Sequence, residues 1–585
     1  MTLRCRIPLG RYWALLARYL RPRLGWVGAL AVLLFCAVGL QLVSPQIMRR
    51  FIDGAGDTSV PLEELLVIAL VFVGVALARQ ILDLSSTYAG RRLAWQATNE
   101  LREDLTLHCL CLDMSFHNEH TPGQMIERID GDVAGLASFL SRFVLLAIGN
   151  LTMLTGTLIV FTVEDWRLGV IMAVYAALTL LALSRQQQVA LPYWLSARAA
   201  AADLFGFLAE RLSGTVDIRA LGAVPHVMRR LYHFTGQRLA REQKASLVNM
   251  RFGLILMGSY AIGQVLVVAA GYYLFGEAGV TLGTVAMLVY YLDLLHRPLT
   301  QLTQQMEEFE QAGASLGRVT ELLQERSVIR TADPTSLPGG SLTLQLSGVC
   351  FAYGEDPVLE DLSFDVQAGR VLGLLGRTGS GKTTITRLLS RLYDPQQGFV
   401  RLGGVELTRL EPEALRSRIS VVSQNAQLLS GTVRDSLTLF DPTHPDSTIM
   451  DVIRDVGMGA WFDGLPAGLD TRLEGDGGGL SAGQAQLLTL ARAFLADPGL
   501  VILDEASSRL DPATEARIEH AVDRLLRGLT GIVIAHRLTT VQRVDDILIL
   551  EDGRVEEWGS RAALASDPSS RFAGLLKTGL EGVLK

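Results

Sequence analysis

The chain has 585 residues, more than one hydrophobic core usually supports, so at least two domains are expected. Hydrophobic residues make up 49% of it and charged residues 19%, with a mean hydropathy of +0.30, which excludes an ordinary soluble enzyme. The net charge of −7 argues against a nucleic-acid partner, and the five scattered cysteines do not form a disulfide framework.

The first 23 residues carry repeated arginines and lack the cleavage site of a signal peptide. They predict a basic amphipathic elbow helix, residues 1–23, that lies on the cytoplasmic leaflet. A membrane domain of six spans is expected over residues 24–325. The apolar stretches that could cross a bilayer lie at 24–44, 65–84, 139–162, 167–184, 252–275 and 280–296.

The links between these stretches alternate in length. Two of them, 85–138 and 185–251, are long, charged and helical in pattern, whereas the others are short. Arginines gather in the N-terminal segment and in both long links, which places these parts and the C-terminal half in the cytoplasm. Arg49 and Arg50, after the first stretch, are a mild exception.

Polar residues inside the spans invite a functional interpretation. Arg79 and Asp83 are four residues apart in the second stretch and can pair on one helix face. Asp293, His296 and Arg297 have the same kind of spacing near the end of the sixth stretch. Each group is either a structural ion pair at the membrane edge or part of a substrate path, and the sequence leaves both open.

Cys109 and Cys111 lie near three histidines in the first long link, His108, His117 and His120. A metal site is one interpretation of this group. The other is a long amphipathic helix, because no paired second set of ligands follows.

Residues 326–340 are rich in proline and glycine and predict a linker to an α/β domain at 341–585. An apolar run at 371–375 leads there into a G-x-x-x-x-G-K-T loop, followed by a helical pattern from Thr384. The loop comprises Gly376, Arg377, Thr378, Gly379, Ser380, Gly381, Lys382 and Thr383. Its backbone N–H groups would cradle phosphates, with Lys382 on the β- and γ-phosphates and Thr383 on Mg²⁺.

A second apolar run, 500–503, ends in Asp504 and Glu505. A strand that delivers an acid at its tip is how such a fold places a carboxylate for Mg²⁺, here Asp504. Glu505 would then polarise the attacking water.

Five further segments show a resemblance to one family. Together with the loop they resemble, in order, the motifs of ATP-binding-cassette (ABC) ATPases. The segments are Tyr353 as the aromatic residue for adenine, Val422-Ser423-Gln424 as the glutamine loop, Leu480-Ser481-Ala482-Gly483-Gln484 as the signature, Ser508-Arg509-Leu510-Asp511 as the D-loop, and Ile534-Ala535-His536-Arg537 as the switch histidine. The signature departs from the family at Ala482, where glycine is usual.

The resemblance implies ATP and Mg²⁺ as cofactors and a nucleotide site that includes Tyr353, Thr384 and Asp511. Thr383, Gln424 and Asp504 would hold Mg²⁺, Glu505 would act as general base, and His536 would hold the γ-phosphate. In this family ATP lies between the P-loop of one subunit and the signature of the other, so one of each implies a dimer with an identical or paralogous chain.

The membrane half resembles exporter-type ABC domains at Glu127-Arg128 with Asp132, Glu210 with Gly214, and Pro298 with Ser315-x-x-Arg318. The long links would carry coupling helices near 115–123 and 213–221. The fold class implied is a helical domain with six transmembrane helices and long cytoplasmic extensions, followed by an α/β P-loop ATPase domain.

The function implied is ATP-driven export or flipping of a lipophilic or amphipathic substrate across the plasma (inner) membrane, in a bacterium, with the ATPase domain in the cytoplasm. One alternative is an exporter-fold importer of a chelated or lipophilic cargo such as a siderophore. Another is a nucleotide-gated channel or regulatory subunit that does not pump. Transport direction and cargo stay open at this point.

Overall fold

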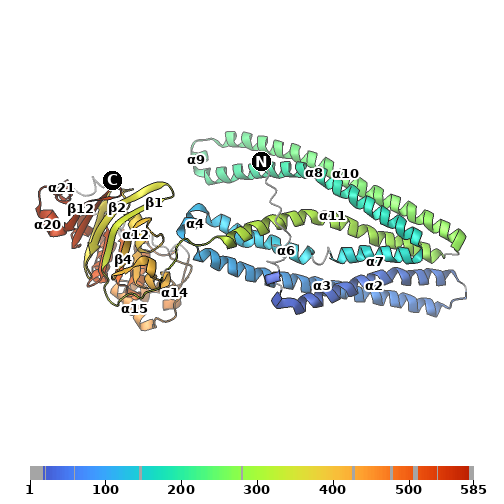
Figure 1. Cartoon of the computed structure of the whole chain (residues 1–585), viewed down its shortest axis with the longest axis horizontal. Helices are drawn as coiled ribbons and strands as arrows, with labels where there is room; N and C mark the ends of the chain where they lie inside the picture. The colour runs from blue at the N-terminus through green and yellow to red at the C-terminus, as the bar shows by residue number, and fades with distance from the viewer. Residues whose placement is uncertain are drawn as a thin grey trace. The chain divides into compact units, whose positions relative to one another are not determined.

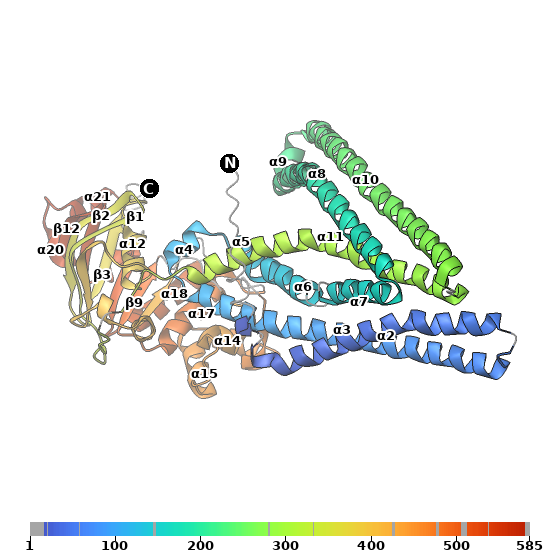
Figure 2. The same cartoon turned by 45° about the vertical axis from the view of Figure 1, so that its right-hand side comes forward.

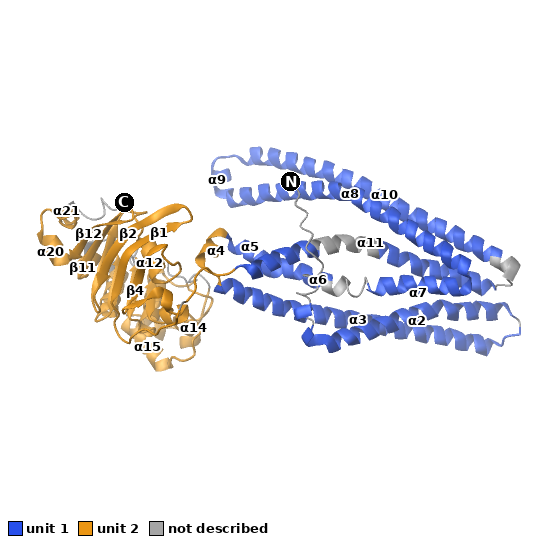
Figure 3. Cartoon of the chain, in the orientation of Figure 1, with its two compact units in different colours: residues 1–111, 120–325 blue, residues 112–119, 326–585 orange. Residues whose placement is uncertain are grey.

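The computed structural model describes residues 17–19, 21–57, 59–143, 148–278, 281–331, 333–423, 428–474, 479–504, 512–535 and 538–578. Contacts divide the chain into two compact units (Figure 3). Unit 1 comprises the residues up to Cys111 and His120–Glu325, and unit 2 comprises Leu112–Glu119 and the residues from Arg326 onward. The eight residues Leu112–Glu119 thus belong to the C-terminal unit by their contacts, which the sequence analysis did not predict.

The described part of unit 1 is built from long helices (Figures 1 and 2). They are η1 (Arg21–Arg23), α2 (Leu24–Gly56), α3 (Leu62–Cys111), α5 (Pro122–Ile126), the π-helical turn η2 (Glu127–Asp132), α6 (Val133–Phe143), α7 (Gly149–Glu164), α8 (Trp166–Ser213), α9 (Thr215–Ala220), α10 (Val224–Ala278) and α11 (Leu282–Gln324).

Four of the described helices are long and apolar enough to cross a membrane: α2 with η1, α3, α8 and α10. The third predicted span falls on α6 and α7, with residues 144–147 between them outside the described residues. The sixth falls on the first part of α11. Beyond the apolar stretches α3, α8 and α10 continue without a break, so the two long links are largely extensions of the same helices.

Helices of unit 1 pack as antiparallel neighbours. α2 packs on α3 and α8 on α10, while α11 contacts α2, α7, α8 and α10. Figure 2 shows the α8–α10 pair diverging from the α2–α3 pair toward the end of the unit that carries α9. A buried cluster around Met172, Leu288 and Leu292 joins α7, α8, α10 and α11.

Arg49, the exception in the distribution of arginines, has a local structural partner. Its guanidinium contacts Glu164 at 3.0 Å and Asp53 at 3.8 Å. Asp53 also accepts hydrogen bonds from the Gly283 N–H (2.8 Å) and the Thr281 hydroxyl (2.7 Å) at the start of α11. A Cβ at position 283 would collide with the Asp53 carboxylate, so the glycine is required there. Arg49 therefore ties helix ends together, and its presence does not contradict the predicted orientation.

Unit 2 contains two main sheets (Figure 1). A four-stranded antiparallel sheet has the order β2-β1-β4-β5 and a six-stranded sheet the order β12-β11-β3-β10-β9-β6, in which all strands but β12 run parallel. The strands are β1 (Leu344–Tyr353), β2 (Asp356–Val366), β3 (Val371–Gly376), β4 (Gln397–Leu402), β5 (Val405–Glu406), β6 (Ile419–Val422), β7 (Gly431–Thr432), β8 (Arg472–Leu473), β9 (Leu500–Asp504), β10 (Thr530–Ile534), β11 (Asp546–Glu551) and β12 (Arg554–Ser560).

The parallel strands are buried on both faces, as continuous apolar runs predict. Alternate residues, such as Leu372 and Leu374 of β3, face the antiparallel sheet, while Val371 and Leu375 face the helices. The helices of unit 2 are α4 (Met114–Glu119), α12 (Lys382–Leu389), η4 (Leu407–Arg409), α13 (Pro412–Arg416), α14 (Val433–Thr438), α15 (Asp446–Asp455), α16 (Gly459–Asp463), η5 (Gly468–Asp470), α17 (Ala482–Leu495), α18 (Pro512–Leu526), α19 (Leu538–Val541), α20 (Arg561–Ser566) and α21 (Arg571–Thr578).

The predicted linker has no helix or strand among its described residues, yet it is bound to unit 2. Arg391, fully buried, donates hydrogen bonds to the carbonyls of Arg330 (2.8 Å) and Leu410. Further along, Arg418 donates to the Gly340 carbonyl at 2.6 Å. Because buried or half-buried guanidinium groups hold both ends of the linker, it is ordered against unit 2.

Candidate functional site

The glycine loop follows β3 and leads into α12, which confirms the predicted order of strand, loop and helix. Gly379 and Gly381 have φ of 88° and 104°, in the region that side chains disfavour. A Cβ on Gly381 would lie 2.6 Å from the Leu359 side chain, and one on Gly376 would collide with the Leu550 carbonyl. The loop can therefore adopt this curled backbone only because these positions are glycines. Helix α12 begins at the C-terminal end of the loop, and the free N–H groups of its first turn favour an anion there.

Two side chains of the loop point to phosphate as its ligand. The Lys382 ammonium is buried and donates to the carbonyls of Gly376 (2.6 Å) and Arg377 (2.8 Å), so it is held inside the curl of the loop. The Ser380 hydroxyl is also buried and has no hydrogen-bond partner in the described structure. A buried hydroxyl without a partner costs free energy, and a phosphate oxygen in the cradle would satisfy it. The cradle thus fits a polyphosphate.

The strands that precede the predicted catalytic residues are neighbours in one sheet. β6, β9, β10 and β3 lie in this order and run parallel, with Val422 opposite Leu503 and Ile534 opposite both Asp504 and Leu374. Carboxyl ends of parallel strands open at one edge, which is where such sheets bind ligands. The last strand residues before the four predicted motifs, Val422, Asp504, Ile534 and Gly376, therefore lie at the same edge.

Asp504 is the last residue of β9 and is half-buried. Thr383 is exposed at the first turn of α12. The carboxylate and hydroxyl oxygens of these two residues are donors that suit Mg²⁺. The other predicted members of the site, Gln424, Glu505, Asp511 and His536, lie outside the described residues, so their roles stay predictions.

The signature segment forms the start of helix α17. Ser481 is the N-cap: its hydroxyl accepts from the Gln484 N–H at 3.2 Å, and the Gln484 side chain accepts from the Ser481 N–H at 2.8 Å. Ala482 is the first helical residue and is exposed, while Gly483 is buried. The position of Ala482 requires no positive φ, and alanine favours a helix more than glycine does. The departure from the family pattern is therefore compatible with the signature fold. Leu480 packs against the adjoining core.

Comparisons with known proteins agree with this geometry. Residues 27–299 match the family described as ABC transporter transmembrane region, and residues 359–508 match the family described as ABC transporter. The chain is 30% identical over 471 residues to a fatty acid ABC transporter ATP-binding/permease protein of Mycobacterium bovis, covering 79% of this chain and 74% of that one. It belongs to the ABC transporter family.

A second relative is an ATP-dependent lipid A-core flippase of Alcanivorax borkumensis, 27% identical over 513 residues, with 87% and 88% of the two chains covered. Among solved structures, a bacterial Atm1-family ABC exporter with ATP bound matches with a TM-score of 0.78 at 22% identity, covering 96% of this chain and 98% of that one. The chain is thus an exporter-type ABC transporter with a helical transmembrane domain and an ATP-binding domain.

In this ABC transporter the predicted adenine residue Tyr353 sits in an aromatic cluster. Its ring meets Phe351 edge-on at 4.9 Å and Tyr393 at 5.3 Å between centroids. Its hydroxyl accepts a hydrogen bond from Arg387 (3.0 Å) and donates to Thr384 (3.4 Å), both on the helix that follows the phosphate loop. These contacts fix the ring next to α12, as an adenine platform requires.

The short helix α4, inside the region predicted as a coupling helix, bonds to the same cluster. Asn118 donates from its amide nitrogen to the Tyr393 hydroxyl at 2.6 Å, and Met114 packs against the core that contains Tyr393. Burial raises the pKa of Tyr393, so its phenol stays protonated at neutral pH. The sequence analysis missed Asn118 and Tyr393, which lie 275 residues apart and carry no local signal.

Asp113, just before α4, holds this segment to the start of the linker. Its carboxylate accepts from the Val328 N–H (2.6 Å), the Ser327 hydroxyl (3.2 Å) and the Ser115 N–H (3.1 Å). Burial raises the pKa of Asp113, but these hydrogen bonds and one from Phe116 outweigh it and leave the pKa below its usual value. The second predicted coupling region, 213–221, contains the short helix α9.

Three of the residues that resemble exporter-type ABC domains, Asp132 of the first long link and Ser315 and Arg318 of α11, contact one another in unit 1. Arg318 donates to both carboxylate oxygens of the buried Asp132, one at 2.8 Å, and to the Ser315 hydroxyl at 3.3 Å. The hydrogen bonds to Asp132 raise the pKa of Arg318, and the charge of Glu127 adds to this. Asp132, Ser315 and Arg318 therefore act as one ionic clamp between η2 and α11.

The polar groups of the spans behave differently from one another. Asp293 and Arg297 form an ion pair at 2.9 Å, whereas no ion pair joins Arg79 to Asp83 in the described structure, so the ion-pair interpretation applies to the first group and not to the second. His296 points away from Arg297, toward Tyr260 at 5.0 Å between ring centroids. An i, i+4 spacing permits a pair but does not require it, because each side chain also has neighbours on other helices.

The cysteine and histidine group forms no metal site within the described residues, which hold no cluster of three or more His, Cys, Asp or Glu side chains suited to a metal. Cys109 is buried and Cys111 is exposed, on different sides of α3. His108 contacts the Leu322 carbonyl at 2.9 Å and so packs α3 against α11. The amphipathic-helix interpretation accounts for all three residues.

Proposed function

We propose that this chain is a half-transporter that uses ATP hydrolysis to export or flip a lipophilic or amphipathic molecule. The observation that carries the proposal is the phosphate cradle, with the buried, unpartnered Ser380 hydroxyl at its centre, on a chain with a long helical membrane unit. The names of the two relatives give a fatty acid and lipid A-core as cargo, which supports an amphipathic substrate. The plasma membrane of a bacterium, with unit 2 in the cytoplasm, fits the arginine distribution.

The chemistry proposed is phosphoryl transfer to water. Lys382 and the loop N–H groups would neutralise the phosphates, while Thr383, Gln424 and Asp504 would hold Mg²⁺, which draws electron density from the phosphate oxygens. Glu505 would accept the proton of the attacking water and His536 would orient the γ-phosphate. Because the strands before Gln424, Glu505 and His536 are neighbours, short loops suffice to bring these groups to one phosphate.

We further propose that the working unit is a dimer in which each ATP lies between the phosphate loop of one chain and Ser481 of its partner. Ser481 is exposed at the start of a 14-residue helix, whose N-terminus favours an anion. The test is a disulfide between Thr378→Cys and Ser481→Cys, two exposed positions, on the background of Glu505→Gln with ATP present. A dimer on a non-reducing gel that needs both cysteines supports the arrangement, and the two single-cysteine chains are the matched controls.

Hydrolysis is tested by the Mg²⁺-dependent ATPase rate of the purified chain in lipid nanodiscs. An active chain that loses activity with Glu505→Gln supports a competent homodimer. A folded chain with no activity would refute the homodimer and indicate a different partner chain. A disulfide that forms within one chain, leaving monomer only, would refute the shared ATP site even if the ATPase were active.

A further inference from the structure

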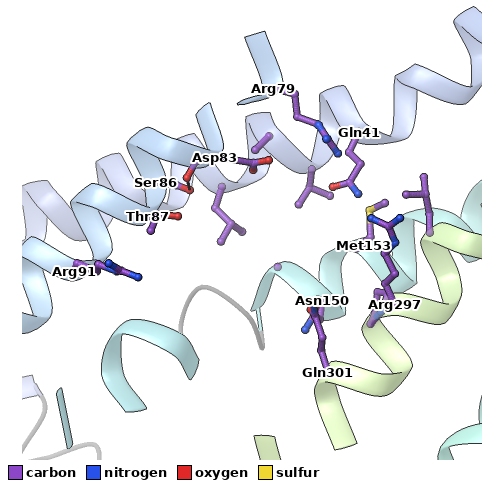
Figure 4. Close-up of a pocket in the computed structure, with 16 residues that line it drawn as sticks. Gln41, Arg79, Asp83, Ser86, Thr87, Arg91, Asn150, Met153, Arg297 and Gln301 are labelled. Atoms are coloured by element: carbon purple, nitrogen blue, oxygen red, sulfur yellow. Dashed lines mark hydrogen bonds between the residues drawn. The ribbon is translucent and has the colours of Figure 1, made fainter. Parts of the chain in front are cut away.

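Helices α2, α3, α7 and α11 line a cavity of about 770 Å³ inside unit 1 (Figure 4). On α3 its lining residues include Arg79, Asp83, Thr87 and Arg91, spaced four apart, so polar groups follow one another along one side of the helix. From Arg79 to Arg91 the helix rises about 18 Å, which makes the site elongated. Arg297 enters from α11, and we call this site the arginine cavity.

The charge of the arginine cavity is positive. Three of its lining residues are arginines and one, Asp83, is acidic. Arg297 is paired with Asp293, but Arg79 and Arg91 form no ion pair or hydrogen bond with any residue that the structure describes. Unpaired cations at membrane depth are costly and mark functional positions by default. Counting Asp293 as well, the cavity keeps an excess of positive charge that a bound anion would neutralise.

An orphaned donor lies in the same wall. Asn150 is 8% exposed, and its amide nitrogen has no hydrogen-bond partner within the described structure. Asn150 of α7 and Gln301 of α11 both line the cavity, and Arg297 lies one turn before Gln301 on α11 (Figure 4). A buried N–H₂ group without an acceptor is rare, and an anionic oxygen in the cavity would supply one. The arginines and Asn150 thus indicate, by independent observations, the same class of ligand atom.

The other lining residues include apolar side chains, namely Leu34, Ala37 and Val38 of α2, Met153 of α7 and Leu294 of α11, beside the uncharged polar Gln41, Ser86 and Gln301. A second cavity of about 670 Å³, between α8 and α10, is lined by residues such as Val174, Leu178 and Ile262 and by no charged side chain. The two sites therefore differ in chemistry. Of these two cavities, the arginine cavity is the one that combines charged donors with apolar side chains.

We propose that the arginine cavity binds an amphiphile with a phosphate or carboxylate head group and a hydrocarbon body. Arg79 and Arg297 bind the head group through charge-assisted hydrogen bonds, Arg91 adds positive charge further along α3, and the α2 side chains contact the hydrocarbon. The inference rests on the proposed function, in that it names the class of molecule that the membrane unit moves. It also assigns Arg79 and Arg297 to the substrate path, which the sequence left open.

The test uses dodecyl phosphate with a diazirine in its chain, crosslinked to the full-length chain in phosphatidylcholine nanodiscs without ATP. Label is expected on the peptides that contain Leu34–Val38 and Met153, as read by mass spectrometry. Unlabelled dodecyl phosphate or dodecanoate should suppress the label, whereas dodecanol should not. Arg79→Gln and Arg297→Gln should each raise the probe concentration that gives half-maximal labelling by roughly tenfold or more, which is the usual effect of losing a charged hydrogen bond. Arg79→Lys should retain more affinity than Arg79→Gln.

Arg92→Gln is the matched control, because Arg92 is next to Arg91 on α3 but lies over the Trp26 ring, at 5.1 Å from its centroid, outside the cavity. Unchanged labelling in Arg79→Gln and Arg297→Gln, or equal competition by dodecanol, would overturn the proposal. Inorganic phosphate that displaces the probe as well as dodecyl phosphate does would indicate a small-anion site and overturn the amphiphile. Because the labelling is done without ATP, its outcome does not depend on transport. A chain that hydrolyses ATP but is not labelled would refute only the proposed cavity site. A chain that is labelled but does not hydrolyse ATP would refute only the proposed pump.

Discussion

Removing Arg318 tests whether the ionic clamp of unit 1 stabilises the chain through charge. Asp132 has a side chain that is only 6% exposed, and Arg318 binds both of its oxygens. Arg318→Ala would leave a buried carboxylate without its counter-charge. Asp132→Asn in the same chain would remove that charge, so the double variant should be more stable than Arg318→Ala alone.

The magnitude follows from burial. Stranding a buried charge costs roughly 3–5 kcal/mol when both partners are buried. The Arg318 side chain is 48% exposed, so water already screens part of the pair, and about 2–3 kcal/mol is expected here. In the double variant only hydrogen bonds are lost, about 1 kcal/mol. The second substitution should therefore restore about 1–2 kcal/mol.

Thermal unfolding of the full chain in nanodiscs gives the order of stability without assuming a two-state transition. The expected order is wild type, then Asp132→Asn and the double variant close together, then Arg318→Ala. Arg554→Ala, which removes an ion pair of unit 2 with Glu360 whose side chains are 69% and 45% exposed, is a control expected to change the melting temperature little. A double variant that melts below both single variants, with the two losses adding, would refute the charge argument.

Three further predictions concern unit 2. Glu505→Gln should retain ATP binding, measured with a fluorescent nucleotide, and nearly abolish turnover; more than about a tenth of the wild-type rate would exclude Glu505 as general base. Tyr353→Ala should raise the KM for ATP with little change in saturated turnover, while Tyr353→Phe, which keeps the ring, should bind like wild type. Asp113→Asn should speed hydrogen exchange at residues 112–119. Because the pKa of Asp113 is lowered on folding, its contribution should be full above its usual value of 3.8 and lost as pH falls through the lower folded value. The measure is the protection factor, which is the observed exchange rate corrected for the pH dependence of intrinsic amide exchange. A difference in protection factor between wild type and Asp113→Asn that does not shrink as the pH is lowered below 3.8 would contradict this reasoning.

The ATP-binding half was predictable because its signals are local. A glycine loop, an acid at the end of a strand and a capped helix can each be recognised within about ten residues of sequence. This is because phosphate binding depends on the local shape of the backbone more than on distant side chains. Ser481 and Gln484 show this well: one segment supplies both halves of the capping box. The exporter fold and the long helical links were confirmed for the same reason, as apolar length and period are local properties.

Contacts between distant segments were not predictable in this way. The hydrogen bond from Asn118 to Tyr393 and the cavity position of Asn150 depend on which elements pack against each other, and a single sequence carries no record of that. Arg79 and Asp83 illustrate this. Their spacing permitted a mutual ion pair but could not decide between that pair and a position in a cavity, and in the structure both residues line the arginine cavity.

The assignment of Leu112–Glu119 to unit 2 places a segment of the N-terminal half of the chain next to the predicted adenine residue. The chain leaves α3 at Cys111, bonds to unit 2 through Asp113 and Asn118, and returns to unit 1 at His120. Asn118 binds Tyr393, whose ring touches Tyr353, the proposed adenine platform. Packed aromatic rings shift together rather than deform, because protein interiors are close-packed. A nucleotide that repositions Tyr353 is therefore expected to move α4, which Asn118 and Asp113 bond to the rest of unit 2.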